Sequence, residues 1–193
     1  NLVLDLVKES NLPYWWSDRP QVMVWLALEE GSEKILSSSD NHVFQALLRE
    51  RADDRGINLK LPIMDFEDRR LVSYKELRSG LAYNIDAASV RYSSNVSLVG
   101  KAKASELSLD DPYFNGSWEF WFEDEHFTVD FESLSARESA RIGVDLVADI
   151  FASRFAVFSG SQRKYNWIIA GISDLSKYAS LKKYFENLEI IDE

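Results

Sequence analysis

The chain has 193 residues, of which 46% are hydrophobic and 13% aromatic, so it can bury a core of ordinary size and is not a disordered segment. It has no cysteine, which excludes disulfides, thiolate metal sites and cysteine nucleophiles, and its net charge of −10 disfavours nucleic acid and anionic lipid as partners. No uncharged apolar run approaches about 18 residues and no leader is visible, so we expect no membrane span in this piece, which begins with Asn1 as a processed or excised chain would.

The first elements predict a strand, a helix and a second strand. Residues 22–30 are too short and too apolar for a surface helix, which indicates a buried strand. Residues 41–56 carry apolar side chains at helical spacing, with Ser39 or Asp40 as the expected N-cap and a glycine at the end. Residues 57–64 then alternate apolar and polar side chains, as a strand does.

A second crossover follows the second strand. Ser73 and Glu76 have the spacing of a capping box, which predicts a helical segment that runs on to Val90 with a possible break near Gly80. Residues 94–104 predict the third strand. Two successive crossovers favour a parallel, right-handed arrangement of these three strands.

The clearest strand pattern covers residues 117–133, which predict an antiparallel hairpin with Asp124 and Glu125 at its turn. One face of this hairpin is aromatic or apolar, at Trp118, Phe120, Phe122, Phe127, Val129 and Phe131. Ser135 and Glu138 again have capping-box spacing and open a long helix that could cover that face.

The end of the chain differs in charge from the rest. From residue 160 on, five basic side chains balance five acidic ones, so the whole net charge of −10 lies earlier. We expect an acidic core domain over residues 1–158, a linker within 158–166, and a truncated β-α-β lobe over 159–193 whose first strand is 165–173. The predicted fold class is α/β (α+β), with a mixed sheet made of a parallel β-α-β-α-β portion and an antiparallel hairpin, helices on its faces, and this partial lobe.

Asp65, Glu67 and Asp68 form the first candidate site. They leave the carboxyl end of a predicted strand, where open α/β sheets bind ligands, so they could bind a small ligand or a cation. The alternative is structural, since carboxylates favour a helix start and Arg69 and Arg70 are placed to neutralise them. The structural interpretation is the favoured one.

The other candidates are histidines, a loop and a surface. His42 and His126 lack a metal-ligand spacing, so we expect no metal and no cofactor. Residues 159–164 could hold an anion, although their composition favours a connector. The polar face of the hairpin carries Trp121 between Glu119 and Glu123, which indicates either a surface for a partner or a surface covered by the rest of the parent chain.

Four blocks of the chain carry a resemblance to a known family: LPYWWSDRPQVMVWLALEE (12–30), LKLPIMDFEDRRLVSYKEL (59–77), VSLVGKAKA (96–104) and GSWEFWF (116–122). With them the chain resembles an uncharacterised proteobacterial envelope family, domain of unknown function 2066. The resemblance implies an exported protein of the periplasm or cell envelope with no assigned activity. It supplies no catalytic residue.

These observations favour a non-catalytic interaction or assembly module of the cell envelope. It would bind another envelope protein, or the remainder of its parent chain, through an exposed sheet edge or the surface around Trp121. The alternative is a small-ligand or cation-binding domain that uses Asp65, Glu67 and Asp68. An enzyme whose carboxylates meet only in space stays open, and the oligomeric state does not follow from the sequence.

Overall fold

The computed structural model describes residues 10, 13, 15, 19–80, 84–105, 112–123, 125–156, 168–172 and 174–186. The chain forms two compact units. The larger unit is Arg19–Phe151, and the other combines Asn1–Asp18 with Ala152–Glu193. The domain boundary near residue 158 stays a prediction. All of the sheet lies in the larger unit.

A six-stranded mixed sheet forms the centre of the larger unit and confirms the predicted α/β fold class. Its strands are β1 (Gln21–Glu30), β2 (Ser32–Ile35), β3 (Asn58–Lys60), β4 (Val96–Ala104), β5 (Phe114–Phe122) and β6 (Glu125–Leu134). The strand order is β2-β1-β4-β5-β6, and β3 also pairs with β1. As predicted, β1 is parallel to both β3 and β4, whereas the β4–β5 and β5–β6 pairs are antiparallel.

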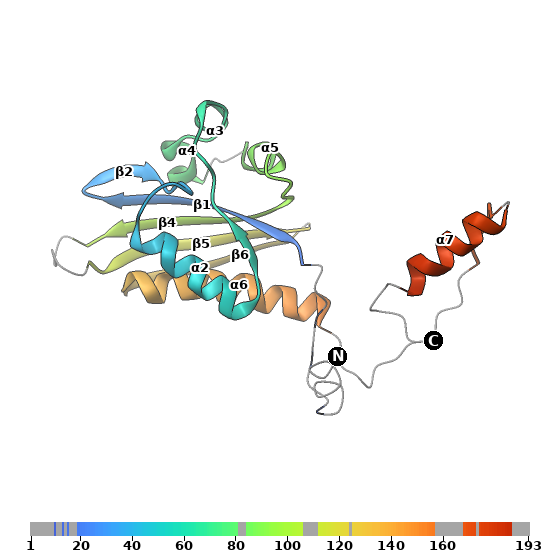
Figure 1. Ribbon diagram of the computed structural model, residues 1–193. Helices are drawn as coiled ribbons and strands as arrows, with labels where there is room; N and C mark the ends of the chain where they lie inside the picture. The colour runs from blue at the N-terminus through green and yellow to red at the C-terminus, as the bar shows by residue number, and fades with distance from the viewer. Residues whose placement is uncertain are drawn as a thin grey trace. The chain divides into compact units, whose positions relative to one another are not determined.

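Helices pack on both faces of this sheet (Figure 1). One face is covered by α2 (Val43–Arg55) and α6 (Ala136–Phe155), and the other by α3 (Phe66–Leu71), α4 (Tyr74–Ser79) and α5 (Ile85–Val90). Because β1 lies between the two helical layers, every residue from Val22 to Leu28 is at most 1% exposed. The apolar run that predicted this strand is therefore the centre of the core.

The ends of the helices follow the sequence with one exception. Neither Ser39 nor Asp40 caps α2, because the Asp40 carboxylate accepts the Ser37 amide at 2.8 Å. The cap is His42, whose Nδ1 accepts the backbone N–H of Phe44 at 3.2 Å, so the predicted cap was wrong.

The remaining signals for helix ends are confirmed. Ser73 and Glu76 form a capping box, and α4 ends at Gly80 in the left-handed conformation, which is the expected break before α5. Ser135 and Glu138 exchange the same pair of hydrogen bonds at the start of α6. These short local signals need no tertiary context, which is why the sequence shows them.

The predicted hairpin is confirmed as β5–β6, and α6 covers its aromatic face. Its turn lies one residue earlier than predicted, because Glu125 is the first residue of β6 and pairs with Phe122. Phe151 of α6 packs edge-on against Phe120 and Phe122, with ring centroids 5.8 and 5.3 Å apart. The indole nitrogen of Trp118 donates to the Ser139 carbonyl at 2.8 Å, which ties α6 to β5. The opposite face of the hairpin is polar, apart from Trp121.

Besides the last residues of α6, the smaller unit contains the described helix α7 (Leu175–Glu186), which confirms the helix of the predicted lobe. The first strand of the expected β-α-β lobe is not seen: residues 168–172 have no strand conformation, and that prediction was wrong for them. A strand needs a neighbour to bond its backbone, and Ile168 is 99% exposed. The proposed linker at 158–166, the loop at 159–164 and the last short strand lie outside the described residues.

Candidate functional site

The acidic loop before α3 is organised around the carboxylate of Asp68. Its side chain is 0% exposed and accepts hydrogen bonds from the Met64 amide at 2.9 Å and from the Tyr92 hydroxyl. Asp65 is the N-cap of α3 and accepts the Asp68 amide at 2.9 Å. Both carboxylates therefore accept hydrogen bonds from backbone amides of their own loop, in which Met64 has a φ of 59°.

The cation that neutralises these two carboxylates is Arg91, at the end of α5. Its guanidinium is bidentate to Asp65, at 2.7 and 3.0 Å, and also pairs with Asp68. The expectation that Arg69 and Arg70 would neutralise the acidic cluster is confirmed only for Arg70, which pairs with Glu67 at 2.9 Å in an exposed bridge. Arg69 instead donates to the Met64 carbonyl. The cation that pairs with the buried carboxylate thus comes from a different helix, whose end places Arg91 beside Asp68.

This arrangement changes proton affinities. The Arg91 hydrogen bonds, followed by the Asp68 amide, lower the pKa of Asp65 to about 2, and Asp65 in turn raises the pKa of Arg91. Burial, followed by the hydrogen bond to Asp68, raises the pKa of Tyr92 to about 12. Among the residues that the structure describes, no group of three or more metal-ligating side chains converges. The geometry favours the structural role of Asp65, Glu67 and Asp68 over a ligand site.

We expect Asp65 to titrate with a pKa of about 2, below its ordinary value of 3.8, in carbon-detected NMR of the folded protein. Because the folded pKa is the lower one, the contribution of Asp65 to stability is present above about pH 4 and is lost as the pH falls toward 2. In Arg91→Leu the pKa of this carboxyl should rise toward 3.8, because the hydrogen bonds from Arg91 are the largest cause of the shift. An unchanged value in that variant would mean that another group sets the pKa.

A second candidate site is a hollow of about 320 Å³ on the face of the sheet that carries α4 and α5. Its lining residues come from those helices and from β4 and β5: Leu77, Gly80, Ile85, Asp86, Val99, Lys101, Glu119 and Trp121. Leu77, Ile85 and Val99 are buried members of the core cluster beneath it, and Trp121 packs against that cluster. The hollow thus has an apolar floor.

The polar wall of the hollow is an ion pair between neighbouring strands. The Lys101 ammonium lies 2.5 Å from the Glu119 carboxylate, and the two side chains are only 13% and 14% exposed. The other oxygen of Glu119 lies 3.6 Å from Nε2 of His126. On β6 His126 stacks on the indole of Trp121, with centroids 4.4 Å apart and planes 13° apart. A hydrogen-bond donor (Lys101), an acceptor (Glu119) and an aromatic ring (Trp121) therefore lie next to one another in the hollow.

The structure brings together two of the three residues that the sequence singled out as a partner surface. Trp121 and Glu119 line the hollow, whereas Glu123 lies in the exposed turn after β5 and does not. The sequence did not indicate Lys101 or Asp86. The alternation in β4 does place Lys101 on the face of Val99, but its meeting with Glu119 depends on the pairing of β4 with β5.

His42 has two structural partners. The Nε2 of His42 lies 2.6 Å from a Glu30 carboxylate oxygen while its Nδ1 caps α2. Its tautomer is therefore set, with the proton on Nε2.

Comparison of the sequence with protein-family models and with curated proteins gives no match in either case. Within the described ranges, no helix is both long and apolar enough to cross a bilayer.

Proposed function

We propose that this chain is a non-catalytic interaction module of the cell envelope, which binds a partner protein at the hollow beside Trp121. The observation that carries the proposal is the combination, in one hollow on the face of the sheet that carries α4 and α5, of an apolar floor with a Lys101–Glu119 ion pair. The envelope location rests on the sequence resemblance alone.

The chemistry of the hollow suits a large amphipathic side chain of the partner. Its apolar body would contact Trp121 and Leu77, and its polar end would meet a donor and an acceptor at Lys101 and Glu119. Tyrosine, tryptophan and arginine combine these properties and are enriched in the centres of protein interfaces. The volume of about 320 Å³ lies at the small end of the range of ligand pockets, which also favours one inserted side chain.

The ion pair supports recognition rather than chemistry. Lys101 donates to Glu119 at 2.5 Å, so neither group is poised as a free base or nucleophile. A partner group that enters the hollow can donate a hydrogen bond to Glu119 while the Lys101–Glu119 ion pair stays intact. The second carboxylate oxygen of Glu119, which lies on the side of His126, can accept this bond.

Photocrosslinking in cells of the source organism tests the proposal. A benzophenone amino acid at Ser79, an exposed residue beside Gly80 at the rim, should give one discrete crosslinked protein. The same probe at Asp53, exposed on α2 in the other helical layer, should not. Trp121→Ala should reduce the yield at Ser79 by about tenfold, as the loss of a central interface aromatic does.

A second substitution makes this test decisive. Asp86→Arg places bulk at the rim without touching the core, since Asp86 is exposed, and it should also suppress the product in a chain of unchanged melting temperature. Equal products from Ser79 and Asp53, or full yield in both substituted chains, would show that the hollow is not the binding surface.

A further inference from the structure

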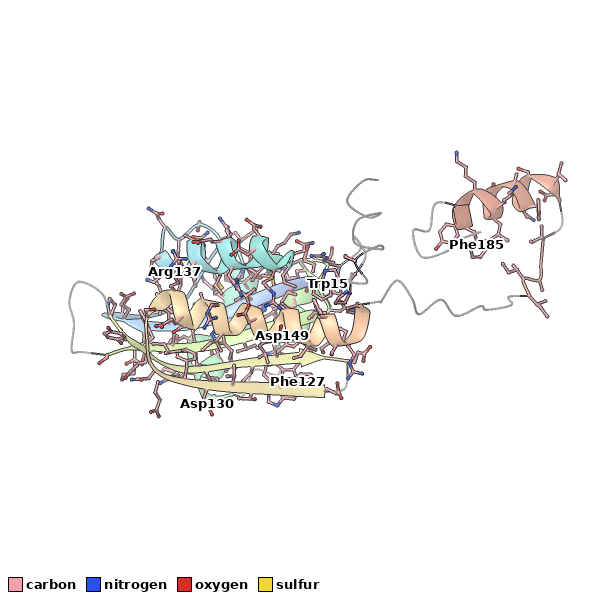
Figure 2. All side chains as sticks on the ribbon, turned by 90° about the horizontal axis from the view of Figure 1, so that it is seen from below. Trp15, Phe127, Asp130, Arg137, Asp149 and Phe185 are labelled. Carbon is pink, nitrogen blue, oxygen red and sulfur yellow. The ribbon has the colours of Figure 1, made fainter. Side chains whose placement is uncertain are left out.

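The outermost strand β6 offers a long open edge. It ends the strand order, and in the part of the chain that the structure describes no strand pairs with its other side. Figure 2 shows β6 at the margin of the sheet, with Phe127 and Asp130 marked on it. Alternate residues of such a strand direct their backbone N–H and C=O groups outward, where another strand can bond them.

The edge of β6 lacks several of the features that normally prevent pairing. Residues 125–131 keep an unbroken register with 116–122 of β5, and the register shifts only beyond them, toward Phe114. The strand is ten residues long and contains neither proline nor lysine, whereas exposed edges are commonly short or carry such residues. The stretch 125–131, which keeps an unbroken register, can accept an added strand.

The charge around this edge is of one sign. The strand β6 itself has no lysine or arginine, and Glu125 at its start is exposed. Asp130 and Glu132 lie exposed on β6 itself. An acidic segment would be repelled here, and a basic one attracted over a distance of about a Debye length, roughly 8–10 Å.

The two faces of β6 define the pattern of the incoming segment. Phe127 and Val129 are half-buried on the side of α6, while Thr128 and Asp130 are exposed on the other side. An added strand alternates in the same way. Its apolar side chains would extend the core beside Phe127 and Val129, and its basic side chains would lie beside Asp130.

We propose that β6 binds an extended partner segment of alternating basic and apolar residues by adding it to the sheet as a further strand. The inference rests on the proposed interaction function and names the chemistry of a partner, but it uses residues distinct from those of the hollow.

The test uses the whole chain and peptides long enough to span residues 125–131. A peptide of alternating lysine and valine should bind in fluorescence anisotropy, and a peptide of alternating glutamate and valine should bind at least about tenfold more weakly, because like charges oppose it. Amide hydrogen exchange should slow at alternate residues of β6 when the lysine peptide is present. The same peptide with N-methyl groups on one edge of its backbone should lose both effects.

Charge substitutions test whether the lysine peptide binds at β6 or at another acidic surface. Asp130→Lys/Glu132→Lys should weaken the lysine peptide by about tenfold, whereas Glu33→Lys/Asp53→Lys, with the same change in net charge on other exposed elements, should weaken it far less. No binding, binding that survives N-methylation, or equal losses in the two variants would each overturn strand addition. Such a result would leave the Ser79 crosslink, and with it the proposed function, standing.

Discussion

Asp68→Asn lowers the free energy of unfolding by about 2–4 kcal/mol in urea denaturation, the amount expected when hydrogen bonds to a buried charge are lost. The carboxylate is 0% exposed and accepts from three donors, the Met64 amide, the Tyr92 hydroxyl and the Arg91 guanidinium. An amide has one oxygen to offer, and its NH₂ group must face one of those donors.

The adjacent carboxylate provides the matched control. Glu67→Gln makes the same chemical change one residue earlier, but Glu67 and its partner Arg70 are 48% and 62% exposed. An exposed pair of this kind contributes about 0–1 kcal/mol, so the control should change stability by less than 1 kcal/mol. Equal effects of the two substitutions, or a gain in melting temperature with Ca²⁺ or Mg²⁺ that Asp68→Asn abolishes, would contradict the structural role of Asp68.

The elements that the sequence predicted correctly depend on local patterns. The alternation in β5 and β6, the spacing in α2 and α6 and the two capping boxes each involve residues within a few positions of one another. The strand β2 was not predicted, because its four residues are too few to show a period and Gly31, at a φ of 67°, turns the chain directly from β1. The strand predicted at 168–172 is absent for a different reason. An apolar run forms a strand only where a neighbouring strand can bond its backbone, and the sequence pattern does not show whether such a neighbour exists.

The candidate sites were less accessible to sequence reasoning, because their partners come from distant positions. Asp65 and Asp68 were identified, but their cation, Arg91, follows 26 and 23 residues later and is positioned by α5. Similarly, Trp121 was identified as an unusual surface residue, but the hollow beside it requires α4 and α5 to pack on β4. The sequence therefore shows which residues of a candidate site are chemically suitable. Which of them lie close together in space is set by the order and register of the strands and by the helices that pack on them.

Gly143→Ala destabilises the fold by about 1–3 kcal/mol, although alanine is the better helix former by about 1 kcal/mol. A Cβ at this position of α6 would lie 2.6 Å from two ring atoms of Trp118, which is closer than real Cβ contacts. The indole has little room to move, because a Cβ at Gly100 of β4 would also lie only 2.4 Å from it and because its nitrogen donates a hydrogen bond to the Ser139 carbonyl. The glycine is required by this close approach of helix and strand.

Thermal denaturation of three variants checks this packing. Gly143→Ala should lower the melting temperature by several degrees, since about 1 kcal/mol corresponds to roughly 2–4 °C in a protein of this size. Arg141→Ala, an exposed substitution in the same helix, should change stability by no more than about 0.5 kcal/mol. In Gly143→Ala/Trp118→Phe the smaller ring leaves room for the new methyl group, so the combined loss should be smaller than the sum of the two by about 0.5 kcal/mol or more. Strict additivity, or a Gly143→Ala chain more stable than the parent, would show that α6 can move away from β5 and that the core between them is not closely packed.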